Sequence, residues 1–216
     1  MRYDILDFVD TAQCDPPLIS HPICAQRQAG LARDWREYQH PLGHAYFYNA
    51  TLRILTTEDL RNPEILQRLL TAHTARIACD PLADRLPTDA EFVIADGAVR
   101  DVHSRLAGVS YHFDDDAGLS DAPKAAFWAH MAAFPAHSRH LPPHTESAFV
   151  RALDAARARA ARGVLSGLAD QEIHWISEQY RGFLVQRQQG MNVTALLSWL
   201  IGVVMPQIGP VGGSIS

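Results

Sequence analysis

The stretch DWREYQHPLGHAYFYNATLRILTTEDL, residues 34–60, decides how the N-terminal part of this chain folds. Aromatic and β-branched residues alternate there with turn-forming residues, and this pattern predicts three short strands, WREY, HAYFYN and LRILTT. HPLG, residues 40–43, supplies proline and glycine for the first turn, and NAT, residues 49–51, supplies the second. Three strands of this size need a partner surface, because such a small meander is marginally stable by itself.

The residues that follow supply helices and a second group of strands. Residues 56–78 place Ile65, Leu66, Leu69 and Leu70 at helical spacing, so a helix is expected to cover the sheet. Further along, EFVIADGAVRDVHSRLAGVSYHF, residues 91–113, predicts a small hairpin with an ADG turn. The C-terminal half has helical periodicity and ends in an apolar tail.

We therefore predict an α+β protein in which a small three-stranded antiparallel sheet packs on a predominantly helical remainder. Four regions are expected along the 216 residues. They are a loosely structured lead-in over 1–30, the sheet over 31–62, a helix with a second small hairpin over 63–122, and a helical region with the apolar tail over 123–216.

The order of features in residues 34–60 resembles a WW domain. Trp35 stands at the place of the first tryptophan of that family, Gly43 lies in the first loop, and Tyr46-Phe47-Tyr48-Asn49 matches the middle strand. The resemblance implies that Trp35 packs behind the sheet against a following proline, for which Pro63 is the candidate. It also implies that Asn49 binds backbone groups at the turn. The wider layout is similar to a class of uncharacterised fungal WW-domain-containing proteins.

The resemblance also identifies a candidate peptide-binding face. WW domains hold proline-rich ligands between a tyrosine of the middle strand and a second tryptophan on the third. Tyr46 matches that tyrosine, with Tyr48 beside it, but the place of the second tryptophan falls on Thr57. Ala50 stands where many family members have a histidine. Because threonine has no flat aromatic face, we expect a degenerate face used for packing or interaction, with proline-rich binding as the alternative.

Composition narrows the class of protein. The net charge of −5 and the sequence pI near 6.1 argue against a nucleic-acid binder that neutralises phosphates. The three cysteines, Cys14, Cys24 and Cys79, are odd in number and widely spaced, which is typical of a reducing compartment. The first ten residues are acidic and lack the apolar core of a secretory signal. A cytoplasmic location is the expectation.

The tail VTALLSWLIGVVMPQIGPV, residues 193–211, carries no charged side chain. As a helix of about 19 residues it would extend roughly 28 Å, close to the thickness of a bilayer core. Pro206 interrupts it, however, and the strongest apolar part, 193–205, is short. A buried core helix or helix–helix interface is expected, with self-association, an interfacial membrane helix or a short tail anchor as alternatives. The contact residues would be Leu196, Trp199, Leu200 and Val203.

Two motifs contain metal-ligand side chains. YHFDDDAG, residues 111–118, offers Asp114 and Asp116, whose oxygens suit Mg²⁺ or Ca²⁺. HMAAFPAHSRHLPPH, residues 130–144, contains four histidines, and His137 and His140 have a spacing that suits Zn²⁺ or Ni²⁺. EF-hand and zincin spacings are absent from both. A solvated acidic turn and a surface loop are therefore the simpler interpretations.

These observations favour a non-enzymatic protein-interaction or scaffold module without a cofactor. Its expected partner is a protein, including a proline-rich peptide as one form, and not a nucleic acid. One alternative is a divalent-metal enzyme that uses Asp114–Asp116 or the His130–His144 loop. The other alternative is a membrane-associated module attached through residues 193–211.

Overall fold

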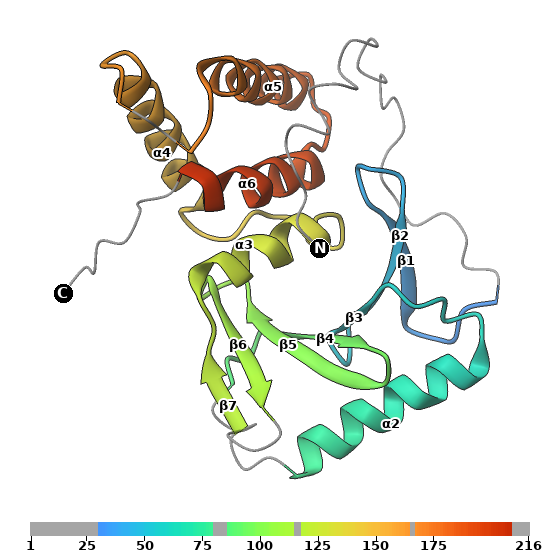
Figure 1. Cartoon of the computed structure of the whole chain (residues 1–216). Helices are drawn as coiled ribbons and strands as arrows, with labels where there is room; N and C mark the ends of the chain where they lie inside the picture. The colour runs from blue at the N-terminus through green and yellow to red at the C-terminus, as the bar shows by residue number, and fades with distance from the viewer. Residues whose placement is uncertain (1–29, 80–85, 115–117, 165–166, 209–216) are drawn as a thin grey trace.

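The computed structural model describes residues 30–79, 86–114, 118–164 and 167–208 (Figure 1). The expected lead-in over 1–30 therefore lies outside the described residues except for Gly30. Asp115, Asp116 and the last residues of the apolar tail also lie outside them.

The described strands form one seven-stranded mixed sheet in sequence order. Every neighbouring pair is antiparallel except β3 and β4, which are parallel. The prediction of a separate three-stranded sheet is therefore wrong, whereas the α+β class is confirmed. The strands are β1 (Trp35–Gln39), β2 (Ala45–Asn49), β3 (Ile54–Thr56), β4 (Ala90–Ala95), β5 (Ala98–Ser104), β6 (Val109–Asp114) and β7 (Gly118–Asp121).

Helix α2 (Pro63–Cys79) connects the first three strands to the others. Parallel neighbours need a crossover connection, and α2 lies between β3 and β4 in the chain. The crossover sets Ile54 opposite Phe92 and Leu55 opposite Val93. The sheet therefore continues through the chain beyond the three strands of residues 34–60.

The β4–β5 hairpin turns at Asp96 and Gly97, between the paired residues Ala95 and Ala98. Both turn residues have positive φ, 54° and 69°. A two-residue turn of this conformation matches the twist of the flanking strands, and Asp-Gly is a favoured sequence for it. The turn brings β5 back beside β4, which sets Glu91 opposite His103.

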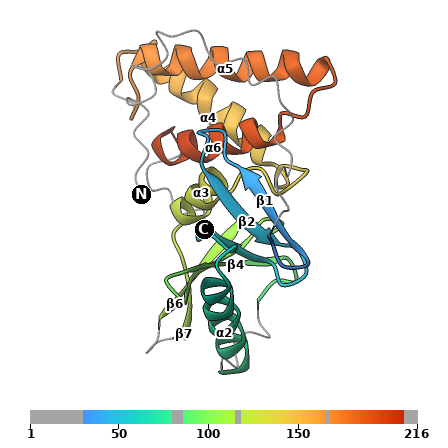
Figure 2. The ribbon, with the colours of Figure 1, turned by 90° about the vertical axis from the view of Figure 1, so that its right-hand side faces the viewer.

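The two faces of the sheet pack against different helices (Figures 1 and 2). Residues paired directly across antiparallel strands point to the same face, so Trp35, Phe47 and Ile54 share one face. They form a buried cluster with Leu69 of α2. Trp35 thus packs behind the sheet, and α2 is the element that covers it there.

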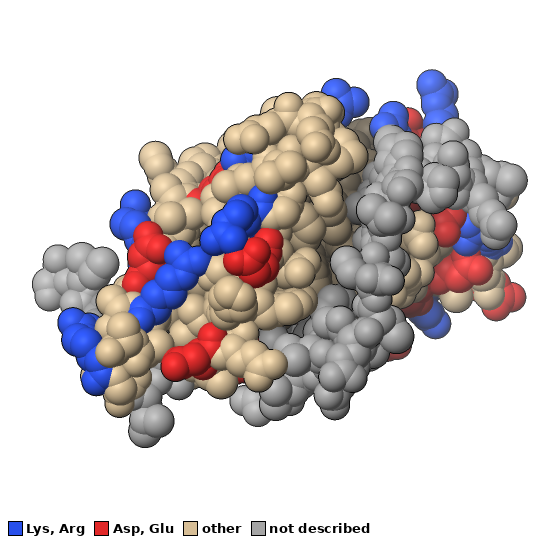
Figure 3. Space-filling view, turned by 90° about the horizontal axis from the view of Figure 1, so that it is seen from above, with Lys and Arg blue, Asp and Glu red and all other residues tan. Residues whose placement is uncertain are grey.

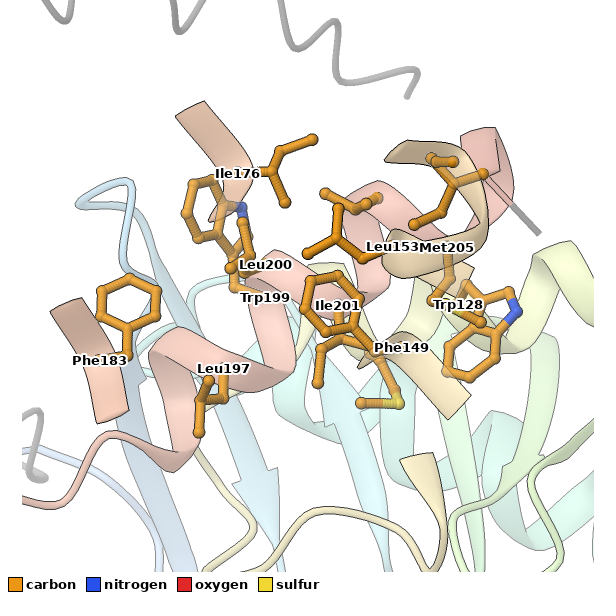
Figure 4. Close-up of a cluster of buried hydrophobic side chains, with 14 of the residues drawn as sticks. Trp128, Phe149, Leu153, Ile176, Phe183, Leu197, Trp199, Leu200, Ile201 and Met205 are labelled. Atoms are coloured by element: carbon orange, nitrogen blue, oxygen red, sulfur yellow. The ribbon is translucent and has the colours of Figure 1, made fainter. Parts of the chain in front are cut away.

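The opposite face lies toward the helical half of the molecule, seen above the sheet in Figure 2. The helices there are α3 (Lys124–Ala133), α4 (Thr145–Ala160), α5 (Asp170–Gln188) and α6 (Thr194–Ile208). α6 contacts α3, α4 and α5, and Figure 4 shows its side chains pointing into their common core. Most of the apolar tail is thus a helix within the core of its own chain.

The four tail residues singled out by the sequence contribute to that core. Trp199 and Leu200 are buried, and Leu196 and Val203 are partly buried against the same cluster. Among the described residues, none of the helices combines the length and the apolar character that crossing a membrane requires. The observed use of α6 is internal packing.

Candidate functional site

The aromatic side chains of β1 and β2 occupy the sheet face that looks toward α3. Tyr38 pairs with Tyr46, and Tyr48 lies two residues further along β2, so all three point to this face. Tyr46 is completely buried, with 0% of its surface exposed, whereas Tyr38 and Tyr48 are half-buried. We call these three tyrosines the aromatic face.

The chain itself covers the aromatic face with the residues that follow α3. We call Phe134–His137, which has the sequence FPAH, the covering segment. The hydroxyl of Tyr46 accepts hydrogen bonds from the backbone N–H of Ala136 (2.7 Å) and of His137 (2.8 Å). The Tyr46 ring meets Phe134 edge-on, with ring centroids 5.2 Å apart. Pro135 is also buried, so a proline-containing segment already fills the candidate peptide-binding face.

The tip of the β1–β2 hairpin holds α3 by a second contact. His40 donates from Nε2 to the Ala132 carbonyl (2.7 Å) and accepts the Leu42 N–H at Nδ1 (3.1 Å). His44 stacks on His40, with ring centroids 4.0 Å apart. Both nitrogens of neutral His40 are therefore used, and burial lowers the pKa of His40 to about 4. A proton added to Nδ1 would displace the Leu42 N–H.

Polar side chains continue the same sheet face across the next three strands. Glu91 of β4 pairs with His103 of β5, and His103 pairs with Ser110 of β6. His103 Nδ1 lies 2.6 Å from Ser110 Oγ. His130, on α3, stacks on His103 with ring centroids 3.9 Å apart. Helix α3 thus covers this row of polar side chains on the sheet face.

Glu91 joins the sheet to both α3 and the covering segment. Its carboxylate oxygens accept from His130 Nε2 (2.8 Å) and from His137 Nε2 (3.0 Å). The side chains of all three residues are buried, at 8%, 0% and 2% exposure for Glu91, His130 and His137. One buried carboxylate therefore positions two histidines, one on α3 and one in the covering segment that follows it.

The charge state of this cluster follows from burial and mutual contact. Burial opposes ionisation of Glu91, but His137 and His130 together hold the pKa of this carboxyl well below its usual range. Burial lowers the pKa of both histidines, against the opposing effect of Glu91. The cluster at neutral pH is one carboxylate that accepts from two neutral imidazoles. Nδ1 of His137 then accepts a hydrogen bond from the Tyr46 hydroxyl at 3.3 Å, and Nδ1 of His130 has no hydrogen-bond partner among the described residues.

Arg105 supplies a positive charge that acts on this cluster. It is buried and directs its guanidinium toward the Phe134 carbonyl (3.4 Å) and the Ser198 hydroxyl (3.4 Å). Its charge lowers the pKa of both His130 and His137 further. Arg105 thus links the covering segment to α6 and disfavours any further positive charge nearby.

The buried position of these groups limits the chemistry that they can perform. The carboxylate, the imidazoles and Ser110 lie beneath α3, and two hollows found on the surface lie elsewhere, one along α2 and one between α4 and α5. The second hollow, about 250 Å³, is lined by charged residues of both signs. Acidic and basic side chains likewise lie close together on the surface seen in Figure 3. The arrangement at the aromatic face orients and holds a segment of chain.

The residues singled out from the WW resemblance have the following places. Trp35 is buried behind the sheet, and Asn49 Oδ1 accepts from the N–H of Thr51 (3.0 Å) and of Leu52 (2.9 Å). Pro63 is exposed at the first turn of α2, and Thr57 is exposed just after β3. The structure brings Tyr46 and Tyr48 together on one face but leaves Thr57 on the surface.

The residues considered as metal ligands are dispersed. Asp114 ends β6, and Asp116 lies outside the described residues. His137 belongs to the buried cluster, whereas His140 is exposed. Within the part of the chain that the structure describes, no group of three or more histidine, cysteine or acidic side chains is arranged to hold a metal ion.

Reasoning from the sequence missed Glu91, His103 and His130 as members of one cluster. The signal was present in the alternation of polar and apolar residues in AEFVIA, RDVHS and GVSYHF, residues 90–95, 100–104 and 108–113. The register that sets Glu91 beside His103 could not be obtained from that alternation alone.

Comparison with known proteins adds no relative. No family model, no curated protein and no solved structure matches this chain.

Proposed function

We propose that this chain is a non-enzymatic protein-interaction and scaffold module whose WW-like strands β1–β3 bind a proline-containing segment of the same chain. The observation that carries the proposal is the hydroxyl of Tyr46, which accepts two backbone N–H groups of the covering segment. Main-chain hydrogen bonds combined with aromatic contacts to a proline-containing stretch are a means of recognising an extended peptide.

The covering segment explains why this face is closed to other ligands at rest. A ligand tethered to its site has an effective concentration on the order of millimolar when the linker is short and suited to the distance. A free peptide must therefore compete with the covering segment for Tyr46. The scaffold role follows, because the same contact joins the sheet to α3 and the helical half.

The other two functions receive less support from the described residues. The apolar side chains of α6 pack against the other helices, so a membrane role would have to use different surface. The histidines considered for metal catalysis divide between a buried cluster and the surface, as described above. The function that remains best supported is peptide and partner binding.

Peptide titration of the full chain tests the proposal. The probe is a labelled peptide AAFPAHSR, which copies residues 132–139. A Phe134→Ser variant loses the edge-on ring contact with Tyr46, so we expect it to bind the peptide at least about tenfold more tightly than the parent chain. Adding Tyr46→Ala to that variant should remove the binding.

A matched control separates opening of the face from general destabilisation. Phe183, on α5, is about as buried as Phe134, with 9% and 7% exposed, but it belongs to the helical core. Phe183→Ser should therefore destabilise the protein without increasing peptide affinity. Equal gains in affinity in Phe134→Ser and Phe183→Ser would contradict the proposal, as would binding that survives Tyr46→Ala.

A further inference from the structure

The covering segment is held by histidines that the fold keeps neutral. His40 binds α3 at the Ala132 carbonyl, while His130 and His137 bind Glu91 from α3 and from the covering segment. His103 lies under His130. These contacts involve one structural unit, α3 with the residues after it, and one sheet face. A proton-linked change in them would act on a single junction.

We propose that protonation of the buried histidines that join α3 and the covering segment to the sheet releases the covering segment from the aromatic face, so that acid opens this face to an extended proline-containing peptide. The proposal deepens the proposed function and rests on it, because the face must first be a peptide site. It adds that pH controls the access of a peptide to the aromatic face.

In the closed form, in which the covering segment lies on the aromatic face, the surroundings of the buried histidines disfavour an additional proton. A proton on His130 would sit at Nδ1, which is buried and for which the described part of the chain offers no acceptor. A proton on His137 would turn Nδ1 into a donor and end the hydrogen bond from Tyr46. Either proton would add a buried positive charge near Arg105. In the released form His137, which belongs to the covering segment, meets water and accepts a proton freely.

The charged groups around the contact of α3 and the covering segment with the sheet all affect protonation of these histidines. Glu91 attracts a proton to either neighbouring histidine, and Arg105 repels it, while burial disfavours the charged imidazole in both cases. Burial and the neighbouring His130 lower the pKa of His103 to about 2, and burial lowers the pKa of His44. The groups that face the junction are Tyr38 and Tyr48 of the sheet, Tyr46, Glu91, His103, Arg105, His130, His137, and the stacked pair His40 and His44, with His112 near His103.

The size of the effect follows from linkage. A histidine that titrates near pH 6.5 when released and stays neutral when buried favours release by about 30-fold at pH 5. Each further histidine that is exposed on release would multiply this factor. We therefore expect peptide affinity to rise by at least about 30-fold between pH 7.5 and pH 5.0, which is the contribution of a single site.

The test uses the full chain and a labelled peptide AAFPAQSR, a copy of residues 132–139 with glutamine in place of His137, so that the probe does not titrate. Affinity is measured at pH 7.5 and 5.0 for the parent and for His130→Gln/His137→Gln. Glutamine keeps an N–H donor for Glu91 but has no proton to gain. We expect the affinity ratio between the two pH values to fall at least about tenfold in the double variant.

His73→Gln is the matched control. His73 is also buried, with its pKa lowered by burial, but it lies on α2 at the other sheet face, against Phe92. Its removal should leave the pH ratio of peptide affinity unchanged. A ratio that falls equally in His73→Gln and in the double variant would overturn the proposal.

Amide exchange of the parent chain, corrected for the pH dependence of intrinsic exchange, tests release without any variant. The amides of Ala136 and His137 should lose protection at pH 5.0 before the Phe92 amide, which binds the Arg53 carbonyl between β3 and β4. Simultaneous loss at all three amides would mean general unfolding and would overturn the proposal.

The two proposals fail in different ways. If the face is no peptide site, neither Phe134→Ser at pH 7.5 nor the parent at pH 5.0 binds the peptide. If only the acid control is wrong, Phe134→Ser binds the peptide at pH 7.5 while the parent shows the same affinity at both pH values.

Discussion

At the scale of single residues, Tyr46 makes contacts that join the sheet to the helical half of the described fold. Its ring packs against Phe134, and its hydroxyl accepts from two backbone donors while lying within reach of His137. Burial raises the pKa of this hydroxyl above its usual value, so Tyr46 stays protonated. A phenol with these contacts acts as a fixed hydrogen-bonding point.

Removing only the hydroxyl of Tyr46 tests this role. In Tyr46→Phe, the N–H groups of Ala136 and His137 lose their acceptor in a poorly hydrated place, so we expect the free energy of unfolding to fall by about 2–3 kcal/mol. Urea denaturation at pH 7.5 measures it. Tyr48→Phe is the control, because Tyr48 is half-buried on the same strand, and its loss should be below about 1 kcal/mol. Equal losses in the two variants would contradict this role.

At the scale of elements, the contact between α3 and α6 decides how the helical half sits on the sheet. Gly202 of α6 meets α3 backbone to backbone, and a Cβ built there would lie 2.5 Å from the nitrogen of Ala132 and 2.7 Å from the oxygen of Trp128. Ala132 is also the residue whose carbonyl binds His40. The α3–α6 contact therefore positions the helix that leads into the covering segment.

Gly202→Ala tests the close approach of these helices. The added methyl group would clash with α3 backbone, so we expect the free energy of unfolding to fall by about 1–3 kcal/mol. Gly182→Ala is a matched control on α5, where the glycine is exposed and an added Cβ meets no atom of the described residues within 4 Å. That change should raise stability by about 0.5–1 kcal/mol. Thermal or urea unfolding of both variants gives the comparison, and a loss in both would argue against a specific clash.

At the scale of the whole molecule, buried neutral histidines make stability depend on pH. The histidines with a lowered pKa lie in several elements, and they include His40, at about 4, and His103, at about 2, against 6.5 for a free side chain. The unfolded chain binds more protons than the folded chain below pH 6.5. Stability is therefore highest above that value and falls as the pH falls toward these lowered values.

We expect this fall to be measurable well above the pH of ordinary acid denaturation. His103 alone should lower the free energy of unfolding by about 2 kcal/mol between pH 7.5 and pH 5.0, at about 1.4 kcal/mol per pH unit below 6.5. Urea denaturation at both pH values in the parent and in His103→Gln isolates this share. A free energy of unfolding that stays constant across this range would contradict the assignment of neutral buried histidines.

How far the sequence predicted the fold differs from element to element. The strands of residues 34–60 and the helix after them follow from local alternation and helical spacing, because those patterns depend on neighbours in sequence. The pairing of β3 with β4 could not be predicted in this way. It depends on where α2 returns the chain, and the apolar stripe of α2 packs in one cluster with buried side chains of both strands.

The residues of the candidate site were likewise predicted only in part from the sequence. Tyr46, Tyr48 and Asn49 were identified from the order of residues, and so was the absence of a second aromatic wall at Thr57. That Phe134–His137 occupies the face depends on residues about 90 positions apart in the chain. Glu91, His103 and His130 likewise meet only because strand register and the placement of α3 bring them together.

The sequence by itself thus determined the local elements, the aromatic order of residues 34–60 and the apolar character of the C-terminal helix. Tertiary structure alone decided that the three strands of residues 34–60 belong to a seven-stranded sheet and that the C-terminal helix packs in the core of its own chain. It also decided that the aromatic face holds a segment of the same chain. The physical reason is that alternation and helical spacing report which side of an element is apolar. Which surface then covers that side depends on non-local packing and on the pairing of buried polar groups.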